Sequence, residues 1–386
     1  MKKTIFVIFL VIVLYAPAFS FANVDEVIWS GVGFSGNWAD RNRLYPVTSS
    51  FFELDNKPLE VWARKLLLDG KSYPFAVKFG TVDISGLDPI ALAITITGEN
   101  VFHEAIIVSN KIKHLENYSI SGAAIFFNLK TKKLVASVPL ITRFSKVYET
   151  KPDENETKKI FKSVLSDDTL GVNFFSEMSK RLEHVKLNSL PSKYVQIGQF
   201  TIDDTVHESV ARSPKKDLIA SYLSTFFENR LMSESGLALI PNKVGYAIGN
   251  KVATRLPSGD MTIVLPEPGY TINFRVHKLL YQKKPNKATD CLCYGGVLSM
   301  TVISHLFGEE EFAKFGLKDV NCCNVDKGVG LDDVTEFQKL LMGILDGLAK
   351  QFKDIDKKWL KVRSFNYSQS KRSIEKISKE FMSTLQ

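Results

Sequence analysis

The sequence predicts an α+β protein with two α/β units of mixed or antiparallel sheets, followed by C-terminal helices. Short apolar segments separated by Gly, Asn and Lys-rich turns fill residues 23–150 and are typical of strands. Residues 191–330 show the same pattern around one long helical segment, and from residue 331 onward apolar residues recur at helical spacing. A chain of 386 residues has the length of two domains with an extension.

The first 22 residues have the features of a cleavable bacterial export signal. Lys2 and Lys3 precede a short apolar run, and the small residues Ser20 and Ala22 predict cleavage before Asn23. The sequence therefore predicts Sec-type export in a Gram-negative bacterium, to the periplasm or the medium. After signal removal we expect no transmembrane span, because the longest later apolar run, 89–96, is too short to cross a bilayer.

The first unit, residues 23–150, is expected to begin with a strand at 27–29 that leads into a glycine turn. One helix is expected at 62–68. The remaining expected strands of this unit are 75–79, 91–97, 123–127 and 134–138.

Residues 151–190 are predicted to be a charged linker with two helices, because Pro152 lies in a highly charged stretch. The helices are expected near 157–166 and 173–185. The second α/β unit, residues 191–330, is expected to contain a helix that begins after Ser213-Pro214 and ends at Gly236. Its expected strands are 194–200, 237–240, 261–265, 270–276 and 296–303.

Residues 331–386 are predicted to form helices with a basic tail. A capping box at Asp333 to Glu336 begins the first, and the last starts near Ser370. Residues 353–386 hold nine Lys or Arg against four Asp or Glu, so the rest of the mature chain is nearly neutral, which argues against a nucleic-acid partner. The last helix carries an apolar stripe with four basic residues around it. It either packs against the core or contacts an anionic membrane surface or polymer. The stripe is Ile374, Ile377, Phe381 and Leu385, and the basic contact candidates are Lys371, Arg372, Lys376 and Lys379.

Each of the two units contains two segments that begin with glycine, and the distance along the chain between the two segments is similar in both units. Gly33 and Gly198 lie near the start of each unit, and Gly122 and Gly296 each lie at a late strand. A tandem repeat of one fold would produce this pattern, and so would coincidence, because glycine-led strands are common.

Four cysteines lie in two clusters, Cys291 with Cys293 and Cys322 with Cys323. In an oxidising compartment we expect disulfides, and two cross-links between the clusters avoid strained neighbouring pairs. The sequence leaves the connectivity open. The C-x-C and C-C spacings differ from the C-x2-C of four-thiolate zinc sites, so no metal site is predicted, although copper binding by the C-x-C pair is an alternative.

No motif identifies a reaction. Gly31 to Gly36 matches G-x-G-x-x-G, but the polar segment that follows contains Pro46 and has no helical period, so we predict no nucleotide cofactor. His277 and His305 flank the first cysteine pair without a signature of a cysteine nucleophile. The sequence therefore predicts no catalytic residue.

Residues 194–303 resemble the α/β domain of periplasmic accessory proteins, of the type in the TolB amino-terminal domain and the curli secretion channel. Strand 195–200, helix 217–234, strand 237–241 and strand 270–276 carry the resemblance. It departs from the pattern at Gly269, where an acidic residue is common, and in lacking a lipid-anchoring cysteine. The resemblance implies an assembly or interaction module without catalytic residues.

Together these observations predict an exported, non-catalytic binding or assembly protein of the cell envelope. Its partner would be an envelope protein, or an anionic polymer or lipid. The alternative is a secreted hydrolase whose active-site residues are dispersed along the sequence.

Overall fold

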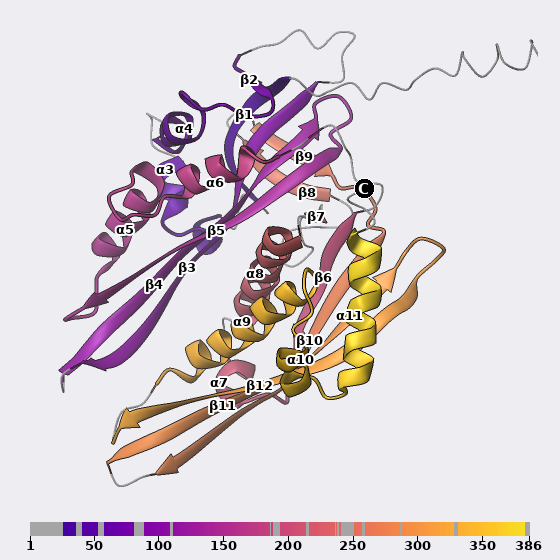
Figure 1. The fold of residues 1–386 in the computed structure, drawn as a ribbon. Helices are drawn as coiled ribbons and strands as arrows, with labels where there is room; N and C mark the ends of the chain where they lie inside the picture. Colours follow the sequence, from indigo (N-terminus) through magenta and orange to yellow (C-terminus); the bar gives the residue numbers. More distant parts are fainter. Residues whose placement is uncertain are drawn as a thin grey trace, which may run out of the picture.

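The computed structural model contains two sheets with a helical layer between them (Figure 1). The export signal at 1–22, Pro214, Gly236 and Leu385 lie outside the described residues. The structure describes residues 26–35, 41–52, 58–80, 89–108, 111–185, 187, 194–213, 216–235, 237, 239–240, 251–256, 259–285, 288–327 and 331–382.

Each unit is built around a mixed sheet, which confirms the predicted fold class. The first sheet has the order β5-β4-β3-β1, with β2 parallel to β1. The second has the order β12-β11-β10-β6-β7. The strands of the first are β1 (Glu26–Ser35), β2 (Ala76–Lys78), β3 (Ile90–Val108), β4 (Lys111–Asn128) and β5 (Leu134–Tyr148); those of the second are β6 (Val195–Ile202), β7 (Leu239–Ile240), β10 (Tyr270–Pro285), β11 (Thr289–Ser304) and β12 (Glu310–Asp326).

Five strands of each sheet share one topology. β1 is parallel to β2 and β3 as β6 is parallel to β7 and β10, and the last three strands of each set form an antiparallel meander. Of these two strands, only β1 also has an antiparallel partner in the described structure, the later strand β8 (Lys251–Leu256). Their irregularities also coincide: a bulge follows Trp29 in β1 and Ile197 in β6, and another follows Ile96 in β3 and Val276 in β10. Shared bulges at shared ladder positions indicate a structural repeat of one fold, because bulges are specific features of a strand pair.

The glycines that suggested the repeat are not equivalent in it. Asn128 and Ser304 pair with the first residues of β3 and β10. Gly122 lies six residues before Asn128, and the residue six positions before Ser304 is Leu298. Gly296 is therefore two residues away from the position that corresponds to Gly122. The repeat is therefore carried by strand order and register, and the glycine echo has no structural counterpart.

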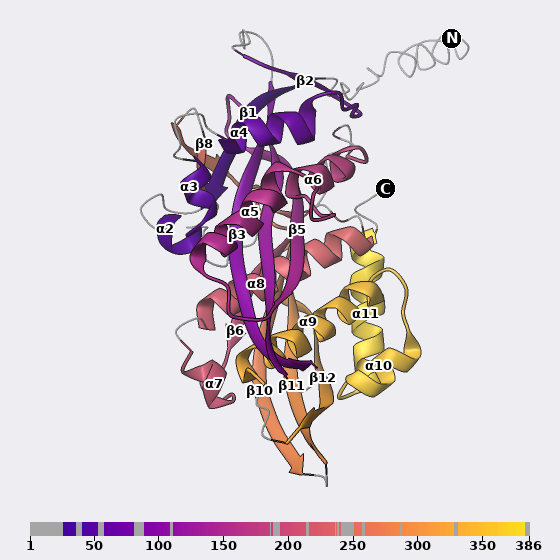
Figure 2. The same cartoon turned by 90° about the vertical axis from the view of Figure 1, so that its left-hand side faces the viewer.

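Helices of the first unit cover one face of its sheet (Figure 2). Asp153 and Asn173 cap α5 and α6 by accepting from backbone N–H groups three residues later. Phe161 of α5 and Met178 of α6 are buried in the core of this unit, so both helices are structural parts of the unit. The helices are α2 (Arg41–Leu44), α3 (Thr48–Phe52), α4 (Pro58–Ala63), a π-helical turn (Arg64–Leu68), α5 (Glu154–Ser166) and α6 (Phe174–Leu182).

Helices of the second unit bury their apolar faces in one continuous core. The apolar face expected for α9 is buried, although Asp332 rather than Asp333 caps the helix by accepting from the Thr335 N–H. α11 buries Ile374 and Ile377 in the same core. The helices of this unit are α7 (Glu208–Ala211), α8 (Lys216–Ser235), α9 (Asp333–Gln351), α10 (Lys357–Arg363) and α11 (Tyr367–Met382).

The second unit's helices also cover the free face of the first sheet. α8 and α9 lie between the two sheets (Figure 1). Tyr222 of α8 makes an edge contact with Phe102 of β3, and the Tyr194 hydroxyl donates to the Val135 carbonyl. The hairpin of β8 (Lys251–Leu256) and β9 (Gly259–Val264) pairs with β1, which brings the first sheet to seven strands. The corresponding face of the second sheet carries no helical layer in Figure 1.

Several sequence expectations were wrong in detail. The predicted glycine turn is part of β1, where Gly31 takes a φ of 98° beside the bulge, a conformation that favours glycine. The strand expected at 261–265 in the second unit is β9, which belongs to the first sheet. The elements that were not predicted are α2, α3, α7, α10, β8 and β12. None of the helices in the described ranges is long and apolar enough to span a membrane.

Candidate functional site

A polar pocket lies where the two units meet. Its walls come from β5 and α6 of the first unit and from α8 of the second, and its volume is about 210 Å³. Pockets at the junction of two units, with a few convergent polar groups, are preferred positions for ligands. The lining residues are Ile141, Arg143, Glu177, Arg181, Phe226, Asn229, Arg230 and Ser233.

Three arginines converge on this pocket. The Arg143 guanidinium lies 4.7 Å above the Phe226 ring, a cation–π contact between the units. Arg181 donates to the Pro139 carbonyl at 2.5 Å, and burial together with the charge of Arg230 lowers its pKa, which Glu177 partly opposes. Like charges held this close favour a bound anion, because an anion removes their mutual repulsion.

Arg230 forms ion pairs with two carboxylates that do not line the pocket. Its Nε lies 2.5 Å from the Asp346 carboxylate, and another guanidinium nitrogen donates to Glu234 at 2.9 Å. Among the lining residues the single carboxylate is Glu177, which accepts a hydrogen bond from Thr142. Because Arg230 is paired with Asp346 and Glu234, the guanidinium groups left to face a ligand are those of Arg143 and Arg181, with Glu177 beside them.

Asn229 adds an acceptor to this wall. Its side chain is 4% exposed, and its Nδ2 donates to the Thr225 carbonyl at 2.9 Å, which fixes the orientation of the amide. Within the described part of the chain its Oδ1 has no hydrogen-bond partner. A buried acceptor without a partner is costly, so a group that donates a hydrogen bond to Asn229 Oδ1 would complement this wall.

The sequence analysis missed this pocket. Its charged residues come from β5, α6 and α8, so no spacing along the chain connects them. The one local signal is a run of three polar residues, Glu228, Asn229 and Arg230, in the middle of α8, of which the first two are buried.

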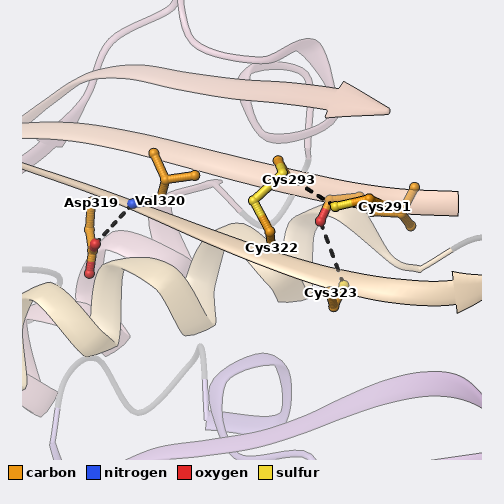
Figure 3. The surroundings of a disulfide bond; sticks show 7 residues. Cys291, Cys293, Asp319, Val320, Cys322 and Cys323 are labelled. Carbon is orange, nitrogen blue, oxygen red and sulfur yellow. Dashed lines mark hydrogen bonds between the residues drawn. A yellow bond between two sulfur atoms is a disulfide. The ribbon is translucent and has the colours of Figure 1, made fainter. Parts of the chain in front are cut away.

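The cysteines confirm a cross-link between the two clusters but not two of them. Cys293 and Cys322 are direct partners across β11 and β12 and form a disulfide (Figure 3). Cys291 and Cys323 are free thiols in the described structure. Successive residues of a strand point to opposite faces, so Cys323 packs towards the core while Cys322 faces outward, and the second cross-link cannot form in this register. Burial raises the pKa of the Cys323 thiol.

We expect thiol titration of the denatured, non-reduced protein to give two thiols, and four after reduction. Peptide mapping should recover Cys293 joined to Cys322, because these two are register partners. A protein with no titratable thiol would restore the original expectation of two disulfides and would require a different register between β11 and β12.

The four basic residues predicted for surface contact all lie on α11. Arg372, Lys376 and Lys379 are exposed, whereas Lys371 pairs with Glu375 at 3.3 Å. Lys376 donates to the Phe312 carbonyl at 2.8 Å. The described residues of the stripe, Ile374, Ile377 and Phe381, are buried in the core, so α11 could meet an anionic surface with its charges and not with these apolar side chains.

A serine, a histidine and an aspartate meet on the open face of the second sheet. The Ser299 hydroxyl lies 2.8 Å from His277 Nε2, and His277 Nδ1 lies 3.5 Å from the Asp203 carboxylate. Arg275 donates to Asp203 at 2.8 Å and holds the pKa of that carboxyl below its usual range. Acyl transfer also needs N–H donors for an oxyanion, but Ser299 lies in the middle of β11, where ladder pairing to β10 and β12 occupies the backbone N–H groups.

The two histidines considered as cysteine partners bond elsewhere. His277 bonds Ser299, and His305 Nε2 lies 2.8 Å from the Thr271 hydroxyl. A third pair, His103 Nδ1 and the buried Glu116 at 2.5 Å, bridges β3 and β4 and was not predicted. These contacts are side-chain bonds between neighbouring positions of sheets and loops, and none involves a cysteine.

Comparison with known proteins gives little further information. No protein-family model and no curated protein matches the chain. Among solved structures, a minor lipoprotein from Acinetobacter baumannii is 10% identical, with 42% of this chain and 87% of that chain covered and a TM-score of 0.21. A putative neuraminyllactose-binding hemagglutinin homolog from Helicobacter pylori is 12% identical, with 44% and 89% covered and a TM-score of 0.24. Scores this low carry no conclusion about fold or function.

Proposed function

We propose that this chain is an exported, non-catalytic binding protein of the bacterial envelope that holds a small anionic ligand between its two units. The convergence of the Arg143 and Arg181 guanidinium groups on the junction pocket is the observation that carries the proposal. The terminal group of an anionic envelope polymer, or a lipid headgroup, has the required charge. A pocket of about 210 Å³ is below the usual 300–1,000 Å³ of small-molecule sites, so it suits one such group rather than a whole lipid.

The export signal and the disulfide support the proposed periplasmic or extracellular location, because disulfides persist in oxidising compartments. The element order quoted for the resemblance to periplasmic accessory domains is present as β6, α8, β7 and β10. An assembly or interaction module of that type is therefore part of the proposal. The alternative, a secreted hydrolase, has only the Ser299, His277 and Asp203 arrangement in its favour, and that arrangement lacks oxyanion donors.

The binding proposal is tested by titrating the mature protein with hydrogen phosphate and with sulfate, two anions of similar size and charge. Hydrogen phosphate carries a donor for Asn229 Oδ1 and sulfate does not, so we expect tighter binding of phosphate. Arg143→Gln and Arg181→Gln should each weaken phosphate binding by roughly 10-fold to 100-fold, since a charge-assisted hydrogen bond contributes about 1.5–3 kcal/mol.

Lys180→Gln is the matched control, because Lys180 is exposed and lies beside Arg181 on α6 but does not line the pocket. It removes one positive charge at nearly the same place and should leave the phosphate Kd unchanged. Arg143 is exposed, so its replacement should not disturb folding. Equal affinity in all four proteins would refute the pocket as the binding site.

Export is tested separately by mass spectrometry of protein recovered from the periplasm or medium. The expected mature chain begins at Asn23, because small residues precede it at both signal-recognition positions. Protein that retains Met1 and stays in the cytoplasm would contradict the proposed location and would leave the phosphate experiment unaffected.

A further inference from the structure

Three cysteine sulfurs gather on the open face of the second sheet. The Sγ atoms of Cys291, Cys293 and Cys322 lie within 4.8 Å of one another, and Cys291 Sγ is 3.8 Å from Cys293 Sγ. We propose that reduction of the Cys293–Cys322 disulfide creates a three-thiolate site for a single Cu(I) ion. Figure 3 shows the three side chains at one place on β11 and β12, with Cys323 apart from them.

Strand register brings these sulfurs together. Cys291 and Cys293 are two residues apart on β11 and therefore share a face, and Cys322 is the cross-strand partner of Cys293. Thiolates bound to one ion at about 2.3 Å lie about 4 Å apart, which is close to the 3.8 Å between Cys291 and Cys293. Reduction lets the Cys293 and Cys322 sulfurs separate to a similar distance without moving the backbone ladder.

The same geometry argues against Cys291 as an attacking thiol in disulfide exchange. Exchange proceeds with the incoming sulfur on the extension of the S–S bond. A sulfur 3.8 Å beyond Cys293 on that line would lie more than 4.8 Å from Cys322, because a disulfide bond itself is about 2.05 Å long. The three sulfurs form a triangle, which is a coordination geometry and not an exchange geometry.

The three cysteine thiolates determine which metal ion this site favours. Thiolates are soft ligands that favour Cu(I), whereas structural zinc takes four ligands. Within the described ranges the group contains three cysteines and no histidine or carboxylate, so it offers three donors. Lys284, the exposed register partner of Cys291, lies beside the negative charge that three thiolates around a monovalent ion would carry.

The reduction step requires a dithiol reductant. The reductant's two thiols give two electrons and two protons to the Cys293–Cys322 bond, which becomes two thiols while the reductant becomes a disulfide. Cu(I) then binds as the three thiols release their protons. The oxidised protein keeps one free thiol at this place and should not form the site.

The test is an anaerobic titration of the reduced, full mature chain with Cu(I) against a chromogenic Cu(I) chelator. We expect one Cu(I) per chain, with an ultraviolet thiolate-to-copper band, and no such binding by the oxidised protein. Cys291→Ser should weaken binding at least 10-fold. Cys323→Ser is the matched control, since Cys323 packs towards the core on the opposite face, and it should bind like the wild type.

Circular dichroism of each reduced variant checks folding before the titration. Equal affinity of Cys291→Ser and wild type would overturn the proposal, and so would loss of binding in a folded Cys323→Ser protein. If Cys291→Ser does not fold, Cys291→Ala provides the second variant. Tight binding by the oxidised protein would also overturn it, because two of the three donors are then in the disulfide.

Discussion

Ile377→Asp is expected to unfold the second unit. Ile377 is fully buried on α11, in the same apolar cluster as Leu317 and Phe352. Truncating a buried isoleucine costs about 2–5 kcal/mol, and an unpaired buried carboxylate adds several more. The sum is more than about 5 kcal/mol, comparable to the whole stability of many domains.

Thermal unfolding followed by circular dichroism measures this effect. Arg372→Asp is the control, because it introduces the same carboxylate on the exposed side of the same helix. We expect it to change the free energy of unfolding by less than about 0.5 kcal/mol. If both variants melt like the wild type, α11 is not part of the core, and a helix that inserts its apolar stripe into membranes becomes the better interpretation.

The packing of α11 also changes how an anionic-surface contact can be tested. Deleting the helix would remove Ile374, Ile377 and Phe381 from the core, so a truncated protein would lose binding by unfolding. Replacing the cations by glutamine keeps the core intact. A contact made by charge alone should weaken as salt shortens the Debye length from about 10 Å at 0.1 M to about 3 Å at 1 M.

Most strands and helices could be predicted from local pattern. β12 was missed because its outward positions carry Lys314, Lys318 and Cys322, and the apolar period of two is confined to a short inner set around Phe315 and Leu317. Pairing with β11 and contact with α11 stabilise β12, and neither interaction can be recognised from the residues of β12 alone. The far ends of long strands were also missed, because the apolar pattern stops there: all residues of β10 after Leu279 are exposed.

The sites depend on tertiary structure in different degrees. The cysteine clusters are evident in the sequence, but only the register between β11 and β12 decides that Cys293 meets Cys322 and that Cys323 faces the other way. The arginine pocket arises only when α8 of the second unit packs on β5 and α6 of the first. The sequence around Arg143 or around Arg230 does not indicate that the two side chains line the same pocket.

Gly122→Ala is expected to destabilise the first unit although it adds a single methyl group. A Cβ at Gly122 would lie 2.6 Å from Phe174 Cζ and 2.8 Å from the Thr95 carbonyl oxygen, both closer than van der Waals contact. The carbonyl belongs to the central strand β3 and cannot turn away, so the strand or α6 must shift. Overpacking of this kind costs about 1–3 kcal/mol, and backbone involvement puts the expected loss at the upper end.

Gly343→Ala is the matched control for this loss, because a Cβ at Gly343 would meet no atom within 4 Å and α9 should gain up to about 1 kcal/mol from the helix preference of alanine. Chemical denaturation of both variants gives the two free energies of unfolding. Since Phe174 begins α6, the helix that carries Glu177 and Arg181, displacement of α6 should also weaken phosphate binding in Gly122→Ala and leave it unchanged in Gly343→Ala. Unchanged stability and binding in Gly122→Ala would mean that α6 and β4 do not pack as closely as the structure has them, and that the pocket wall on the first unit is built differently.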